Sequence, residues 1–292
     1  MPTSTLCRMI TAVCGPMWAS APTNKFAMIT TQKIGTLEYL TAEGITVPHC
    51  FTTRFGGVSE GQFDSLNIAI KEGETEENVE KNLSILASAL DFRMENLVLT
   101  RQTHTNWVRV VTKEDHMGPF HRPYPECDAL VTNDPGTALM IFTADCTPIL
   151  FHDPVTGAVG AAHAGWRGTA TAIVKNVVET MVREFGCDPA NIHAAIGPNI
   201  GACHFETDAD VPDAMVEAFG DEVKQFIQPR GSKYYVNLKE INALILRRAG
   251  VRHIEISDAC TVCQCDRFWS HRVTGGLRGS QGAIILCKEE QK

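Results

Sequence analysis

Short stretches rich in β-branched and small apolar residues recur through the middle of the chain, at 97–99, 107–111, 129–131, 138–142, 148–151, 158–162, 192–196, 253–256 and 283–286. Their length and composition are typical of strands. Because helical patterns interrupt them at irregular intervals, the sequence predicts an α/β fold of layered mixed β-sheets covered by helices. No Gly-x-Gly-x-x-Gly follows any of these stretches, so a dinucleotide site is not predicted.

Two amphipathic helices are predicted from apolar residues that recur close to every 3.6 positions. The first covers 76–92, with Thr75 as its N-cap, and the second covers 169–185, starting at a hydroxyl N-cap and stopping at Gly186.

Residues 237–240 have the spacing of a capping box and predict a third helix that runs up to Gly250. A fourth helix is predicted around 212–219.

The organisation of the 292 residues favours one domain. No repeat, low-complexity tract or long linker follows residue 25. We therefore expect residues 1–25 to form a poorly ordered extension and residues 26–288 to form the catalytic domain.

The charge balance limits the partners. The chain has 26 Lys and Arg against 34 Asp and Glu, a net charge of −8, and no basic cluster, so nucleic acid is not an expected partner. Charged residues interrupt every apolar run before it could span a bilayer. A small anionic substrate remains open, since a few arginines suffice for it.

The eleven cysteines are odd in number and scattered from Cys7 to Cys287, which favours reduced thiols and a cytoplasmic protein. The first twenty residues resemble a signal peptide, but Gly15 and Pro16 break the apolar run, and we interpret them as an extension.

Three potential metal ligands fall at strand ends or in adjoining turns: His104, Cys146 and His163. Two imidazoles and a thiolate are donors that zinc prefers, and three protein ligands leave the fourth tetrahedral position open, as in catalytic sites. Taken singly, each His could instead be a structural residue, and Cys146 a small core residue.

Two glycine-containing segments carry arginines that could bind an anion. Gly165 and Gly168 lie where a helix begins, with Arg167 between them; the alternative is a tight turn with an exposed arginine. The second segment holds Arg54 before Gly56 and Gly57, and Asn67 follows it.

The C-terminal part adds further candidate residues. Phe268 and Trp269 could stack on a flat ring beside His271 and Arg272, or could belong to the core. Cys260, Cys263 and Cys265 place three sulfurs in six residues, but no fourth ligand is local, so they are interpreted as thiols near a pocket rim.

These motifs together resemble the laccase-domain family, also called the polyphenol oxidase or purine nucleoside phosphorylase family. The resemblance rests on Thr-Arg-Phe-Gly-Gly-Val-Ser at 53–59, Leu-Asn at 66–67, Gln-Thr-His at 102–104, Cys-Asp-Ala-Leu-Val-Thr at 127–132, Ala-Asp-Cys-Thr-Pro at 144–148, Ala-His-Ala-Gly-Trp-Arg-Gly at 162–168, Ala-Ile-Gly-Pro at 195–198 and Phe-Trp-Ser-His-Arg at 268–272.

The resemblance implies a single α/β domain similar to the catalytic fold of deamidating cysteine toxins, with zinc bound by His104, Cys146 and His163. It also implies phosphorolysis of adenosine, inosine, guanosine and methylthioadenosine, together with adenosine deamination. For phosphorolysis, Arg54 and Arg167 would hold phosphate, and Asn67, His271 and Arg272 would bind the nucleoside.

For deamination, Asp128 would shuttle the proton. A nucleoside-binding protein without turnover is one alternative, and two enzyme alternatives remain open as well. One is a metal-free amidohydrolase with Cys146 as a nucleophile activated by His163. The other is a copper-dependent polyphenol oxidase, since such a site could take copper in vitro, although no His-x-His pair is present.

Overall fold

The computed structural model describes residues 29–288. The predicted extension at 1–25 lies outside this range. The strands are β1 (Ile29–Ile34), β2 (Leu37–Ala42), β3 (His49–Thr52), β4 (Leu97–Leu99), β5 (Val108–Val110), β6 (Ala129–Thr132), β7 (Ala138–Thr143), β8 (Thr147–His152), β9 (Val159–Ala164), β10 (His193–Ile196), β11 (Glu206–Thr207), β12 (Ile227–Arg230), β13 (Lys233–Val236), β14 (His253–Ile256) and β15 (Gln281–Leu286). The α-helices are α2 (Glu76–Leu90), α3 (Trp166–Ala170), α4 (Ile173–Phe185), α5 (Asp210–Phe219), α6 (Leu238–Arg248) and α7 (His271–Thr274).

Two six-stranded mixed sheets form the centre of the molecule. The first has the order β1-β2-β3-β15-β7-β4, the second has the order β14-β10-β8-β9-β6-β5, and a small third sheet has the order β11-β13-β12. Most neighbouring strands are antiparallel, and the parallel pairs include β4 with β7 and β5 with β6.

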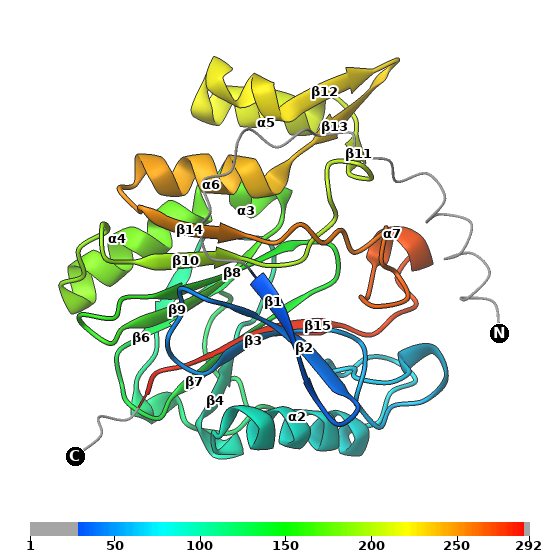
Figure 1. Cartoon of the computed structure of the whole chain (residues 1–292), viewed down its shortest axis with the longest axis vertical. Helices are drawn as coiled ribbons and strands as arrows, with labels where there is room; N and C mark the ends of the chain where they lie inside the picture. The colour runs from blue at the N-terminus through cyan, green and yellow to red at the C-terminus, as the bar shows by residue number, and fades with distance from the viewer. Residues whose placement is uncertain (1–28, 289–292) are drawn as a thin grey trace.

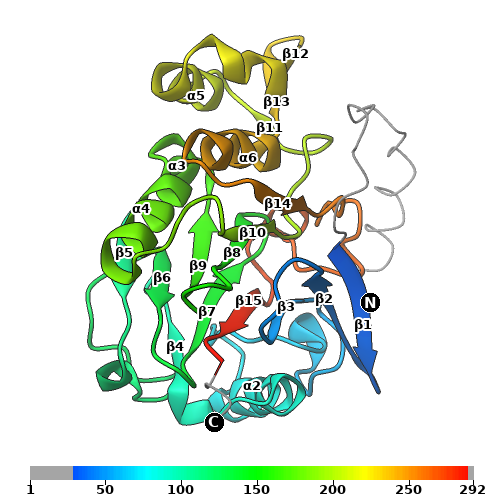
Figure 2. The ribbon, with the colours of Figure 1, turned by 60° about the vertical axis from the view of Figure 1, so that its left-hand side comes forward.

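The two large sheets pack face to face, with helices on both outer faces (Figure 1). Apolar side chains from both sheets, such as Ile141 and Leu150, fill the space between them. Helix α2 covers the first sheet through buried residues that include Leu83. Helices α4 and α6 cover the second sheet, and α5 lies with the small sheet beyond α6 (Figure 2). The predicted layered α/β architecture is confirmed.

The helix boundaries agree with the sequence at most ends. Thr75 caps α2 by accepting a hydrogen bond from the Asn78 N–H at 3.1 Å, and Gly186 ends α4 in a left-handed conformation. The predicted start at Thr169 is wrong. Ala172 adopts a φ of 58°, which separates the short α3 from α4.

Most described cysteines are free thiols, as expected, but Cys263 and Cys265 are disulfide-bonded, so the expectation of reduced thiols is wrong for these two. Within residues 29–288, no helix combines the length and the apolar character that crossing a bilayer requires.

Three histidines lie side by side on the neighbouring strands β8, β10 and β14. His152 is 3% exposed and pairs with His193, which stacks on His253 with ring centroids 4.3 Å apart. Burial and the positive charge of a protonated His193 lower the pKa of His152 to about 4. The folded protein therefore keeps His152 neutral at pH values where the unfolded chain binds a proton.

We expect this histidine to make the fold sensitive to acid. Between pH 6.5 and 4 the unfolded state binds more protons at His152 than the folded state does. As the pH falls through this range, His152 therefore lowers the free energy of unfolding by about 3 kcal/mol. Urea unfolding at pH 7 and pH 4 should show a smaller loss for His152→Gln than for wild type, with exposed His121→Gln as the control. Equal losses in His152→Gln and wild type would contradict the prediction.

Candidate metal centre

His104, Cys146 and His163 converge at one end of the second sheet. His104 lies in the loop before β5, Cys146 in the turn between β7 and β8, and His163 in β9. Strands β8 and β9 pair with Pro148 opposite His163, which places the turn that holds Cys146 beside this histidine. The three ligand atoms lie within 4.8 Å of one another, and Cys146 Sγ is 3.9 Å from His104 Nε2. We call these three residues the His-Cys-His centre.

The carboxylate of Asp128 holds the ring of His163 and the backbone that carries His104. His163 Nδ1 lies 2.8 Å from Asp128 Oδ1, so His163 Nε2 is left to face the centre. The backbone N–H groups of Thr103, His104 and Thr105 donate to the same carboxylate at 2.8–3.1 Å. These bonds hold His104 at a φ of 65°, a conformation that is rare outside glycine. A carboxylate behind a ligating histidine is a common feature of metal sites.

Because Gly165 has no side chain, the side chains of His104 and Cys146 can lie close to its backbone. A Cβ atom at this position would lie 2.9 Å from His104 Cδ2 and 3.2 Å from Cys146 Sγ. The donor set, the histidine held by a carboxylate and this absent side chain all fit a divalent metal ion.

Charge in the centre favours a thiolate. Burial alone would raise the pKa of Cys146, but the charge of His163 and hydrogen bonds from both histidines lower it to about 6. Burial acts to lower the pKa of His163, yet Cys146 and Asp128 raise it to about 9. Burial acts to raise the pKa of Asp128, but its hydrogen bonds to His163 and the 103–105 loop lower it to about 2. A deprotonated sulfur is the form that binds metal or acts as a nucleophile.

A cavity of about 530 Å³ is lined in part by Gln102 and Thr103, which directly precede His104, although none of the three centre residues lines it. Its volume suits a small-molecule ligand. The polar and aromatic side chains that line it include Lys71, Arg101, Arg122, Glu126, Phe120 and Phe142.

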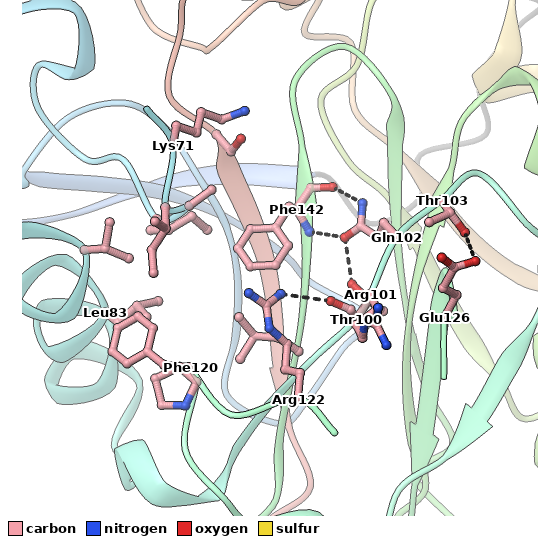
Figure 3. Close-up of a pocket in the computed structure, with 17 residues that line it drawn as sticks. Lys71, Leu83, Thr100, Arg101, Gln102, Thr103, Phe120, Arg122, Glu126 and Phe142 are labelled. Atoms are coloured by element: carbon pink, nitrogen blue, oxygen red, sulfur yellow. Dashed lines mark hydrogen bonds between the residues drawn. The ribbon is translucent and has the colours of Figure 1, made fainter. Parts of the chain in front are cut away.

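Hydrogen bonds among the lining residues fix one wall of this cavity (Figure 3). Gln102 bonds to both the backbone N–H and the carbonyl of Phe142, at 2.7 and 2.8 Å. Arg122 donates to the Thr100 carbonyl at 3.1 Å and lies over the Phe142 ring. The cavity thus combines cationic groups with flat apolar surfaces.

Sequence reasoning did not identify Lys71, Arg101, Arg122 or Glu126. Each lies in a loop or bridge outside the glycine-rich motifs, and nothing in their local sequence distinguishes them from surface residues. The proximity of Arg101 to the Gln-Thr-His motif is the one available signal.

The arginines and the asparagine expected from sequence lie in three different environments. Arg167 is exposed in the first turn of α3, two residues after Gly165, and stacks on Trp166. The Arg54 guanidinium lies over the Trp269 ring and donates to the carbonyls of Asp64 and Cys265. Asn67 is fully buried, and its amide makes hydrogen bonds within the loop and to Glu74 and Ser280. Neither Arg54, Arg167 nor Asn67 lines the cavity.

The residues expected near the C-terminus also separate. Phe268 and Trp269 are 0% and 2% exposed, so they belong to the core and the ring-stacking interpretation is wrong. His271 is exposed at the start of α7. Arg272 donates to the backbone carbonyls of His204 and Glu206 at 2.9 and 3.0 Å.

Known proteins match this chain over most of its length. The model of the family described as multi-copper polyphenol oxidoreductase laccase matches residues 48–288. The chain is 34% identical over 244 residues to the purine nucleoside phosphorylase YlmD of Bacillus subtilis, covering 82% of this chain and 88% of that protein. It is 38% identical over 252 residues to the purine nucleoside phosphorylase of Deinococcus radiodurans, covering 85% and 92%.

The solved structures include close neighbours. The crystal structure of YlmD from Geobacillus stearothermophilus superposes with a TM-score of 0.84 at 34% identity, covering 90% of this chain and all of the other.

Proposed function

The chain belongs to the multi-copper polyphenol oxidoreductase laccase family, and we propose that it is a cytoplasmic, zinc-dependent purine nucleoside phosphorylase. One observation carries this proposal: Gln102 and Thr103, which line a cavity with cationic groups and aromatic rings, directly precede His104 of the His-Cys-His centre in the chain. The proposed substrates are adenosine, inosine, guanosine and methylthioadenosine, each with inorganic phosphate.

In this reaction a phosphate oxygen forms a bond to ribose C1′ while the bond from C1′ to the purine breaks and the base leaves with a proton. Lys71, Arg101 and Arg122 would hold the phosphate through their positive charges and orient its attacking oxygen toward C1′. Phe120 and Phe142 offer flat surfaces for the base. Glu126, the one acidic side chain among the described residues that line the cavity, would hold the proton.

The His-Cys-His centre would hold the zinc ion, which would supply positive charge and a Lewis-acidic position. Asp128 would keep both histidines oriented toward it. Arg167 remains a proposed phosphate ligand because it is exposed close to Gly165, and His271 remains a proposed nucleoside contact. The donors of Arg54, Asn67 and Arg272 are used within the fold, and we propose structural roles for them.

Inosine and phosphate provide the direct test. We expect hypoxanthine release to require phosphate, and Arg122→Ala to raise the phosphate KM by about 10- to 100-fold with a smaller change in the inosine KM, since a charge-assisted bond contributes about 1.5–3 kcal/mol. Arg167→Ala tests the second phosphate ligand in the same assay. Exposed Arg93→Ala is the matched control. An unchanged phosphate KM in Arg122→Ala would remove this residue from the phosphate site.

The thiolate at Cys146 favours a second candidate, the metal-free amidohydrolase, because a Cys beside a protonated His is also an activated nucleophile.

Adenosine deamination is a further proposed activity of the same site. Asp128 is fully buried and its carboxylate already accepts several hydrogen bonds. Glu126 would therefore carry the proton in deamination. Formation of inosine from adenosine without phosphate tests deamination.

A copper oxidase needs several copper ions close together. Within residues 29–288, the described metal-ligand groups are the His-Cys-His centre and one separate cysteine-rich group. We therefore propose zinc as the resident ion and copper only as an occupant in vitro.

A further inference from the structure

A second group of metal ligands lies outside the proposed active site. Cys203, His204, Cys260 and Cys263 place their ligand atoms within 4.8 Å of one another. No fourth ligand lies near the three sulfurs at 260–265 in the sequence. The fold supplies two, because Asn199 and Cys260 form a parallel bridge that brings the 199–204 segment alongside. We call these four residues the Cys-His cluster.

The distances within the cluster match a tetrahedral ion. Zinc–sulfur bonds of about 2.3 Å place two tetrahedral sulfurs about 3.8 Å apart. The sulfurs of Cys203 and Cys263 are 3.4 Å apart. His204 Nδ1 lies 3.2, 3.4 and 3.8 Å from the sulfurs of Cys203, Cys263 and Cys260. A small contraction or expansion would bring all four atoms to bonding distance from one ion.

The backbone around the cluster is arranged for a thiolate. The Gly201 N–H donates to Cys260 Sγ at 3.1 Å, and the N–H groups of Val262 and Cys263 also approach this sulfur. A Cβ atom at Gly201 would lie 3.3 Å from the sulfurs of both Cys203 and Cys260, so a larger residue would crowd them.

The surroundings balance the charge of the cluster and pack apolar side chains against it. Three thiolates, one neutral imidazole and Zn²⁺ have a net charge of −1, and buried Lys239 places a positive charge near Cys203 and Cys260. Ile200 and Val262 pack around the cluster as a small apolar core.

We propose that Cys203, His204, Cys260 and Cys263 bind a second zinc ion when the disulfide of Cys263 is reduced. Two equivalents of a small thiol give up two electrons and two protons, the sulfur–sulfur bond at Cys263 breaks, and one small-molecule disulfide forms. Zinc binding then displaces the protons that the cysteine sulfurs of the cluster still carry. Four protein ligands close the tetrahedron, so this ion is structural.

The cluster is connected to the active site through Asp145, the residue before Cys146. Thr261, between the cluster cysteines, donates to Asp145 Oδ1 at 2.5 Å, and Ser270 donates to Oδ2 at 3.1 Å. Zinc in the cluster would therefore fix the turn that carries Cys146.

Zinc content in the Cys146→Ala background tests the proposal independently of the proposed function, because the His-Cys-His centre then lacks its thiolate. After reduction with a phosphine, incubation with zinc and removal of free metal, elemental analysis should find one zinc ion per chain. The same protein left oxidised should contain much less. Cys146→Ala/Cys203→Ser and Cys146→Ala/His204→Gln should both lose the ion.

Cys146→Ala/Cys187→Ser is the matched control, since Cys187 is a free cysteine outside the cluster, and it should retain one ion. The reduced, zinc-loaded Cys146→Ala protein should also lose thermal stability on chelation, while the Cys203→Ser double variant should not. Absence of zinc from the reduced Cys146→Ala protein, or its full retention after loss of Cys203 and of His204, would overturn the proposal.

Discussion

Substitution of Cys146 by alanine is expected to remove one zinc ion per chain and to lower phosphate-dependent hypoxanthine release by more than about 100-fold. Loss of an outer partner of a metal ligand already costs about 10- to 100-fold in affinity or activity, and Cys146 is a ligand itself. Cys146 lies in a turn and is only half-buried, so the fold should tolerate a smaller side chain. Cys187→Ala is the control for a thiol elsewhere.

The same cysteine separates the phosphorylase from the amidohydrolase. A zinc-bound thiolate should resist alkylation until a chelator is added. A free nucleophile should react at once, because the pKa of Cys146 without metal is about 6. Immediate labelling of zinc-loaded protein, with loss of activity that a chelator does not alter, would favour the amidohydrolase.

Asp128→Asn is expected to weaken metal binding by about 10- to 100-fold. The carboxylate accepts from His163 on one side and from the N–H groups of Thr103 and Thr105 on the other. An asparagine presents one acceptor and one donor, so its NH₂ group would face either His163 or these backbone donors. We expect a higher zinc dissociation constant and a proportional loss of activity at limiting zinc.

Asp153→Asn is the matched control, because Asp153 is equally buried but lies outside the His-Cys-His centre. It should reduce stability without changing zinc affinity. If Asp128→Asn and Asp153→Asn affect zinc binding equally, Asp128 has no specific role in orienting the histidines.

The sequence predicted the central strands and helices because their apolar periodicity reflects burial on both sheets. It missed β1 to β3 and the small sheet β11-β13-β12. Strand β1 is mostly exposed, and β12 contains Pro229, which is tolerated because this strand lies at a sheet edge. The break at Ala172 was also hidden, since alanine is the best helix former and gives no sign of a left-handed conformation.

The three members of the His-Cys-His centre could be predicted because their residue types are selective for metals and glycines accompany them. The cavity and the Cys-His cluster could not. Both depend on segments distant in sequence, such as 203–204 and 260–263, whose proximity is determined by strand pairing. The sequence also does not show which hydrogen-bond donors are already used within the fold. For this reason Asn67 and Arg54 were expected to bind a ligand, although both are bonded to protein groups.

The most direct test of the central claim is a zinc titration of metal-free Cys203→Ser protein, which should report on the His-Cys-His centre alone. Hypoxanthine release from inosine and phosphate is measured at each step. We expect activity to rise linearly with zinc and to reach its maximum at one ion per chain, with no release when phosphate is omitted. Full activity without metal, or release that does not depend on phosphate, would contradict the account.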